Sequence, residues 1–303
     1  MKGGFPSSDA PMRMVRRILL AQIDRAIAGL QRPNLTDHTI HVVRLDLKRA
    51  RATLRLLREC IGEEAYRREN LCMRDAARPL TAVRDANVLL DTLRRLDPAA
   101  PARQRQDFVR QLLRVLRQER RAVRQRLRRK DVTAAAAALI AVKSRLQGVP
   151  EAQLDRGSLG TGVGRAYESG RKAFAQVRKR PTDESLHEWR KQTKYLANQL
   201  EILLPLRPKR FAESCKRSSR LAERLGEDHD LALLGAKIFH YARGPYAASQ
   251  NDAAAELIGR LARQRKALQS KAYRIGRQLY RAKLRRMAAN LDAGLRSEKS
   301  RQP

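Results

Sequence analysis

Apolar residues recur at three- and four-residue spacing along nearly the whole chain, with Arg and other polar residues between them. This period is typical of amphipathic α-helices, and no stretch of alternating β-branched residues is long enough to predict a strand. The pattern therefore predicts an all-α protein. The expected helices span residues 12–31, 36–61, 63–96, 102–130, 132–147, 162–179, 183–206, 208–243 and 251–293.

A segment that disfavours helix separates the fifth and sixth expected helices. Residues 148–161 contain Pro150 and three glycines, which are residue types that interrupt helices. We predict that this segment is a linker. It divides the chain into an N-terminal bundle, residues 12–147, and a C-terminal bundle, residues 162–293.

The two sides of this linker repeat one another. Six residues of the first half recur 146 positions later, namely Thr36, Asp37, Ile40, His41, Arg44 and Lys48 as Thr182, Asp183, Leu186, His187, Arg190 and Lys194. Four more recur at an offset of 145, namely Leu80, Asp85, Val88 and Leu89 as Leu225, Asp230, Leu233 and Leu234. Each Thr-Asp pair is expected to cap a basic helix. The repeat predicts two helical bundles that face each other and derive from an internal duplication.

The charge balance points to a polyanionic partner. The chain has 303 residues, with 66 Lys and Arg against 31 Asp and Glu, a net charge of +35 and a pI near 11.4. Arg supplies 51 of the basic residues, and its planar fork of donors binds phosphate oxygens in pairs. Aromatic residues make up only 4% of the chain, which leaves few platforms for stacking bases. A phosphate polymer without bases therefore fits better than single-stranded nucleic acid.

The cysteines and the apolar runs indicate a cytoplasmic protein. Cys60, Cys72 and Cys215 lack the paired spacing of a disulfide framework or a zinc site, so we expect free, buried thiols. The longest apolar run, residues 132–142, is about 11 residues long and too short to span a bilayer. The N-terminal residues do not form a secretion signal, because basic residues and Asp24 precede any long apolar stretch.

Basic residues form a stripe beside the apolar face of the expected helix 36–61. The stripe consists of His41, Arg44, Lys48, Arg51 and Arg55. At 1.5 Å per residue it extends over about 21 Å, which suits an extended anion. The expected helix 183–206 carries a matching set, namely His187, Arg190, Lys191 and Lys194. We expect the two stripes to line one groove, because a merely solvated face has no reason to repeat across a duplication.

Two further helices supply candidates for ligand contact. These are Arg114, Arg117 and Arg121 in helix 102–130, and Lys271 and Arg274 in helix 251–293. Repulsion along such stripes costs stability, and a bound anion would relieve it. The alternative for these residues is a solvated basic face whose stems cover the core.

The repeated histidines stand among cations, which oppose protonation, whereas a bound anion favours it. We therefore expect His41 and His187 to become protonated on binding, with tighter binding toward about pH 6. Alternatively, they are uncharged donors or core histidines. A second group is expected to orient or neutralise the basic side chains, namely Arg84, Asp85, His229 and Asp230.

Four motifs together resemble the CHAD domain, the conserved histidine α-helical domain. They are H-x-x-R-L-x-x-K-R-A-R (residues 41–51), L-x-x-x-R-D (80–85), H-x-x-R-K-x-x-K (187–194) and L-G-x-x-H-D (225–230). The resemblance covers residues 12–293. It implies two pseudo-symmetric four-helix bundles with a basic central surface that binds inorganic polyphosphate, in some members at polyphosphate granules. It also implies ligand contacts by His41, Arg44, Lys48, Arg51, His187, Arg190 and Lys194.

Two positions depart from the family pattern. Ala197 stands where the second repeat often carries another base, and Thr81 replaces the Gly of the L-G pair. The two halves are therefore expected to contribute unequally. Family members are often fused to a triphosphate-tunnel phosphohydrolase domain, and nothing in this chain resembles one.

The sequence thus predicts a non-catalytic protein that binds inorganic polyphosphate without a metal or cofactor, in the cytoplasm and at polyphosphate granules. Its basic outer faces offer a further surface for nucleic acid. One alternative is a protein that binds only the backbone of DNA or RNA. Another is a metal-dependent phosphohydrolase built on the His229-Asp230 dipeptide, although the first half has Arg84 at the position of His229.

Overall fold

The computed structural model describes residues 11–96, 103–154, 158–205, 208–243 and 251–281. These residues form α-helices, a short 3₁₀ helix and connecting turns, with no strand among them, so the predicted all-α class is confirmed. The elements are α1 (Pro11–Gln31), α2 (Asp37–Leu54), α3 (Arg58–Ile61), α4 (Glu63–Ala76), η1 (Arg78–Leu80), α5 (Thr81–Arg95), α6 (Arg103–Arg126), α7 (Arg129–Gln147), α8 (Glu151–Leu154), α9 (Leu159–Lys179), α10 (Asp183–Leu203), α11 (Pro208–Ala242) and α12 (Asn251–Leu279).

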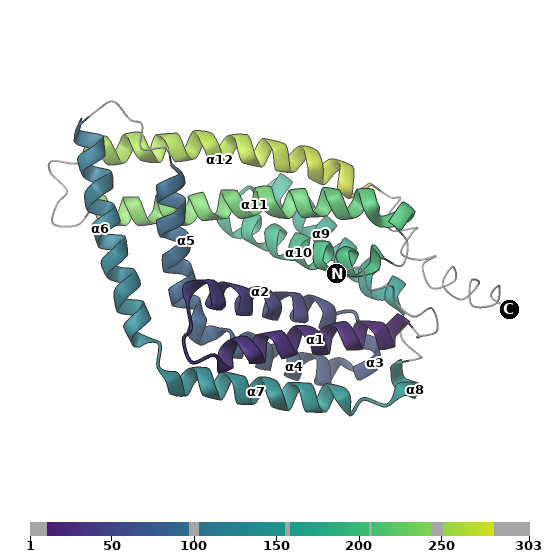
Figure 1. Cartoon of the computed structure of the whole chain (residues 1–303). Helices are drawn as coiled ribbons and strands as arrows, with labels where there is room; N and C mark the ends of the chain where they lie inside the picture. The colour runs from purple at the N-terminus through teal and green to yellow at the C-terminus, as the bar shows by residue number, and fades with distance from the viewer. Residues whose placement is uncertain (1–10, 97–102, 155–157, 206–207, 244–250, 282–303) are drawn as a thin grey trace.

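The helices α1, α2, α4 and α7 pack around one another in the lower half of Figure 1. Each places an apolar stripe inward, as amphipathic helices do. Leu19, Leu47, Met73 and Leu139 are among the side chains that this packing buries almost completely. The first half of the chain thus builds its own helical layer, with one side of α2 turned toward the second half.

The helices α9, α10, α11 and α12 form the other layer, in which each packs against the next. Its centre is aromatic, because the rings of Phe174 and Trp189 pack in a tilted arrangement with centroids 4.8 Å apart. Gly276 lets α12 approach this pair closely, since a Cβ atom at that position would lie 2.7 Å from Cζ2 of Trp189. The second layer is therefore packed tightly behind α10.

A second hydrophobic core joins the two halves of the chain. The helices α5 and α6 run across the molecule from the first layer and pack against α11 and α12, as Figure 1 shows. Phe108 and Leu112 of α6 and Leu90 of α5 are buried there with Leu234 and Leu257. The halves therefore share a core, while their origin by duplication and the division at a linker stay predictions.

Two expected helices are each divided in the structure. The expected helix 63–96 breaks between α4 and α5, where Pro79 lacks the N–H that a continuing helix needs and η1 forms instead. The expected helix 36–61 ends at Leu54, and a turn leads into α3. The first break changes the direction of the chain and lets α5 leave the first layer.

The predicted linker is shorter than expected, because α9 begins at Leu159 rather than at residue 162. Gly160 and Gly162 are buried within this helix. A Cβ atom at Gly162 would lie 2.9 Å from the Leu56 side chain, so this glycine permits close packing of the first turn of α9. The predicted end of the last helix, residues 282–293, lies outside the described residues.

The cysteines are free, as predicted. Cys60 and Cys215 are buried as expected, whereas Cys72 is only half-buried. Burial raises the pKa of the Cys60 thiol to about 11, which keeps it protonated. Across the described part of the chain, no helix is long and apolar enough to cross a membrane.

Candidate functional site

The helices α2 and α10 begin with the caps that the sequence predicted. The Thr36 hydroxyl accepts a hydrogen bond from the Thr39 amide at 3.1 Å. The Thr182 hydroxyl accepts one from the Ser185 amide at 3.1 Å, and the Ser185 hydroxyl accepts from the Thr182 amide at 2.9 Å. These caps satisfy N–H groups that have no partner within the helix, and they fix the register of both basic stripes.

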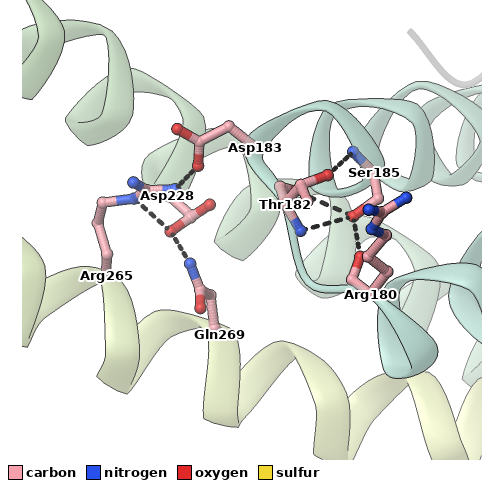
Figure 2. A network of polar contacts seen from close by, with 7 residues as sticks. All are labelled: Arg180, Thr182, Asp183, Ser185, Asp228, Arg265 and Gln269. Carbon is pink, nitrogen blue, oxygen red and sulfur yellow. Dashed lines mark hydrogen bonds and ion pairs between the residues drawn. The ribbon is translucent and has the colours of Figure 1, made fainter.

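A polar network, referred to below as the brace, fixes α10 against α11 and α12 (Figure 2). Asp228 is 2% exposed and accepts hydrogen bonds from Arg265 Nε at 3.0 Å and Gln269 Nε2 at 2.9 Å. Arg265 also forms an ion pair with Asp183 in the first turn of α10. Because His229 and Asp230 directly follow Asp228, the brace sets their position relative to α10.

Arg44 and Arg190, at matching positions of the two basic helices, are held in place in different ways. Arg44 Nη1 donates to the Ala77 carbonyl at 3.1 Å and to the Thr81 hydroxyl at 2.6 Å. Arg190 lies against α11, where its Nε would be 4.0 Å from a Cβ atom at Gly226. The Nε atoms of both arginines are buried and have no hydrogen-bond partner among the described residues. Both guanidinium groups thus keep a buried Nε donor that is unsatisfied in the free protein.

Three helices contribute to a cluster of cations between the two layers. We call Arg44 and Lys48 of α2, Arg84 of α5, and Arg190 and Lys194 of α10 the cation cluster. The positive charges of Arg84, Arg190 and Lys48 all disfavour protonation of Lys194. Those of Arg44, Arg84 and Arg190 do the same to Lys48. The structure therefore brings the stripes of α2 and α10 together and adds Arg84.

Both lysines of the cation cluster have strongly lowered pKa values. Burial and the neighbouring cations lower the pKa of Lys48 to about 8 and that of Lys194 to about 7. The Lys48 side chain remains exposed to solvent although protein surrounds its ammonium group on most sides. We keep the name groove for the predicted binding site at the cation cluster. Near neutral pH, Lys194 is therefore only partly protonated.

Two carboxylates act as counter-charges in the groove. The negative charge of Asp85 favours protonation of Arg44 and Lys48, and that of Asp230 favours protonation of Lys194. Neither carboxylate forms an ion pair or hydrogen bond with another described residue. Burial raises the pKa of Asp230, against the effect of the nearby cations. Two carboxylates are too few to neutralise the five members of the cation cluster.

Three histidines border the cluster in their neutral form. The His187 and His229 rings lie with centroids 4.8 Å apart. Burial and then the Arg190 charge lower the pKa of His229 to about 4. Burial and neighbouring cations also lower the pKa values of His41 and His187. Their protonation on ligand binding stays a prediction.

A cavity of about 400 Å³ opens between α5 and α11 at this cluster. It is lined by Arg84, Val88, Asp91, Arg94, Arg95 and Asp230. Arg94 and Arg95 are not among the ligand contacts predicted from the sequence. The helical spacing could have indicated Arg95, because Arg84, Asp91 and Arg95 fall on one face of the expected helix 63–96, at spacings of seven and four residues.

Several predicted ligand contacts lie elsewhere. Arg51 Nε donates to Asn70 Oδ1 at 3.0 Å, so this side chain turns toward α4. The Arg55 guanidinium lies 3.9 Å from the centroid of the Tyr195 ring, where α2 meets α10. Lys191 stands beside His187 and forms an ion pair with Glu188 on its own helix. The groove therefore occupies only the N-terminal part of the α2 stripe.

The outer stripes are separate from the cation cluster. Arg114, Arg117 and Arg121 are exposed on α6, because the opposite, apolar side of this helix packs against α5 and α12. Arg274 is exposed on α12. Lys271 lines a second cavity that also includes Asp230. Ligand contact by the three α6 arginines and Arg274 therefore stays a prediction, at positions outside the cation cluster.

The described residues contain no group of three His, Cys, Asp or Glu side chains that could hold a metal ion. The ring that faces His229 is that of His187, and the carboxylate of Asp230 faces Arg190 and Lys194. The arrangement is suited to holding an anion through several cations and neutral donors.

Comparisons with known proteins agree with this architecture. The family model described as CHAD domain matches residues 17–238. The crystal structure of the CHAD domain from the plant Ricinus communis is similar, with a TM-score of 0.59 and 22% identity over 93% of this chain and 96% of that chain. PptA from Streptomyces chartreusis has a TM-score of 0.62 and 15% identity over 88% of this chain and 99% of that chain. A search of curated proteins finds no match.

Proposed function

The chain belongs to the CHAD domain family, and from this premise we propose that it binds inorganic polyphosphate in the groove at the cation cluster. One observation carries the proposal. No member of the cation cluster forms an ion pair with another described residue, although many exposed arginines of this chain do. Like charges held together in this way destabilise the free protein, and a bound polyanion would relieve the repulsion.

The chemistry of the groove favours a phosphate chain over nucleic acid. Arg44 and Arg190 place two guanidinium groups beside Lys48, and Arg binds phosphate oxygens through a planar fork of donors. No Phe, Tyr or Trp lines the cavity between α5 and α11, so its described walls offer no aromatic platform for a base. A chain of phosphates supplies closely spaced negative charges without requiring such a platform.

Binding without catalysis is part of the proposal, as is location at polyphosphate granules. The histidines are neutral in the free protein and can donate a hydrogen bond to a phosphate oxygen. The two carboxylates keep part of the cluster charged without blocking it. Phosphate release measured with Mg²⁺ or Mn²⁺ tests the absence of catalysis directly.

Two double variants with the same change in charge test the site. We expect Arg84→Gln with Arg190→Gln to weaken the binding of long-chain polyphosphate at physiological salt by about tenfold or more, which is the size of one or two lost charged contacts. The control, Arg114→Gln with Arg117→Gln, removes two exposed charges from α6 and should change the dissociation constant less than about twofold. Equal losses in the two variants, measured by calorimetric titration, would show that only net charge matters and would contradict the assignment.

Competition at fixed ionic strength separates polyphosphate from nucleic acid. Affinity for any polyanion falls as salt rises, because counterions are released on binding. At one salt concentration, duplex DNA and RNA should compete less well per phosphate than polyphosphate does. Equal competition would contradict specificity for polyphosphate.

A further inference from the structure

A second cavity adjoins the groove and has a different character. It has a volume of about 400 Å³ and lies among α5, α11 and α12. Leu96, Leu231 and Leu268 give it an apolar floor. Leu96 and Leu231 belong to the second hydrophobic core, and Leu268 packs against that core. The cavity therefore exposes apolar side chains at the edge of this core. A chain of phosphates is charged along its length and would not bury them.

The two cavities share residues, so one molecule can reach both. Arg95 and Asp230 line the second cavity and also the cavity that contains Arg84 and Arg94. An occupant of both needs a compact apolar part joined directly to phosphates. Each volume falls within the range of about 300–1,000 Å³ that is usual for sites that bind small molecules.

We propose that the two cavities together bind a nucleoside polyphosphate, with the base and sugar over the leucine floor and the phosphates toward Arg84 and Arg94. The position of the phosphates rests on the proposed function of the groove. The position of the nucleoside rests on the second cavity alone.

The rim of the second cavity favours a nucleoside over a fatty chain. Glu227 is held by two contacts from Arg224 Nη1, at 2.8 and 3.0 Å, and its carboxylate oxygens can still accept from the hydroxyls of a ribose. Gln264 provides both a donor and acceptors for the edge of a base. A fatty chain would leave these polar groups desolvated without partners, which is costly.

Arg95 is placed to contact both parts of such a ligand. Its Nη2 atom donates to the Thr92 hydroxyl at 3.2 Å, which holds the guanidinium at the junction of the cavities. A planar guanidinium can stack on a base and can also bind a phosphate oxygen. Lys271 adds a second positive charge on the α12 side.

The test compares ATP with inorganic tripolyphosphate, because both carry three linked phosphates and only ATP has a nucleoside. Calorimetric titration of the full chain without divalent metal should show that ATP binds about tenfold more tightly than tripolyphosphate, because only the nucleoside of ATP fills the second cavity. Ala267→Phe places a large side chain in the cavity from an exposed position of α12. We expect this variant to lose the advantage of ATP while tripolyphosphate binding changes less than about twofold.

A matched variant controls for changes in the helix itself. Ala262 is exposed on the same helix and lines neither cavity, so Ala262→Phe should leave both affinities unchanged. If ATP and tripolyphosphate bind equally to the native chain, or if the advantage survives Ala267→Phe, the inference is overturned and the polyphosphate proposal stands. If neither ligand binds and long-chain polyphosphate also fails to bind, both proposals are overturned.

Discussion

Arg44 Nη1 donates a hydrogen bond to the Thr81 hydroxyl at 2.6 Å, across the break between α4 and α5. The corresponding position of the second half is Gly226, which lies inside the unbroken helix α11 beside Arg190. One half therefore orients its arginine with a hydroxyl at a helix break, and the other orients it by packing on a continuous helix. This is a physical reason for Thr81, where the family pattern has Gly.

We expect Thr81→Val to weaken both folding and binding. The substitution keeps the shape of the side chain but removes the acceptor for Arg44, so the free energy of unfolding should fall by about 1–2 kcal/mol. Polyphosphate affinity should fall by about threefold to tenfold, because Arg44 loses one of two fixed contacts. Urea unfolding and calorimetric titration measure the two effects.

Thr133→Val is the matched control, because the Thr133 hydroxyl is exposed and donates only to the Arg129 carbonyl of its own helix. Its binding of polyphosphate should equal that of the native chain. A similar loss of affinity in both variants would mean that the contact between Arg44 and Thr81 has no part in positioning the groove.

Lys194→Met should stabilise the free protein and weaken its binding of polyphosphate. The Lys194 ammonium is surrounded by cations and partly desolvated, so replacing it with an apolar side chain should raise the free energy of unfolding by about 1 kcal/mol or more. The exposed Lys216 of α11 offers the control, since Lys216→Met should alter neither property appreciably. A destabilised Lys194→Met protein would contradict the repulsion that underlies the proposed function.

The stability gained by Lys194→Met should depend on pH in a defined direction. In the unfolded chain this lysine keeps its proton up to its ordinary pKa of 10.5, whereas in the folded protein it loses the proton near pH 7. The native protein therefore bears the full cost of the buried charge below pH 7. Denaturation at several pH values should show the largest gain below pH 7 and a smaller gain as pH approaches 10.5.

Polyphosphate affinity should rise as pH falls from about 9 to about 6. A bound anion favours the charged forms of Lys48, Lys194 and His187, whose pKa values are lowered in the free protein, so binding takes up protons. Titrations in two buffers with different enthalpies of ionisation measure that uptake. An affinity that stays constant over this range would contradict the coupling.

The sequence was a good guide to features that depend on local residues. The spacing of apolar positions predicted the helices, and the repeated Thr-Asp pairs predicted the caps at Thr36 and Thr182. The repeat also selected Arg44, Lys48, Arg190 and Lys194, which the structure brings into one cluster.

Features that depend on which element covers a helix face were not predictable in this way. Arg51 and Arg55 share the stripe of Arg44, yet α4 and α10 cover the far end of that stripe and take these side chains into other contacts. Arg95 reaches the groove because α5 crosses to α11, a path set by the break at Pro79. Periodicity along one helix holds no information about such long-range packing.

Asp228→Asn should test whether the brace positions the groove or only stabilises the fold. The buried Asp228 carboxylate accepts from Arg265 and Gln269, and its neutralisation should lower the free energy of unfolding by about 2–4 kcal/mol.

Glu119→Gln is the matched control, because Glu119 pairs with Lys237 between α6 and α11 at 2.5 Å, away from the cation cluster. Both variants make the chain one unit more positive, so charge alone would tighten polyphosphate binding in both. We expect weaker binding only in Asp228→Asn, measured where both variants are folded by circular dichroism, because His229 and Asp230 then lose their fixed place beside Arg190. Tighter binding in both would show that the groove tolerates loss of the brace and responds to net charge alone.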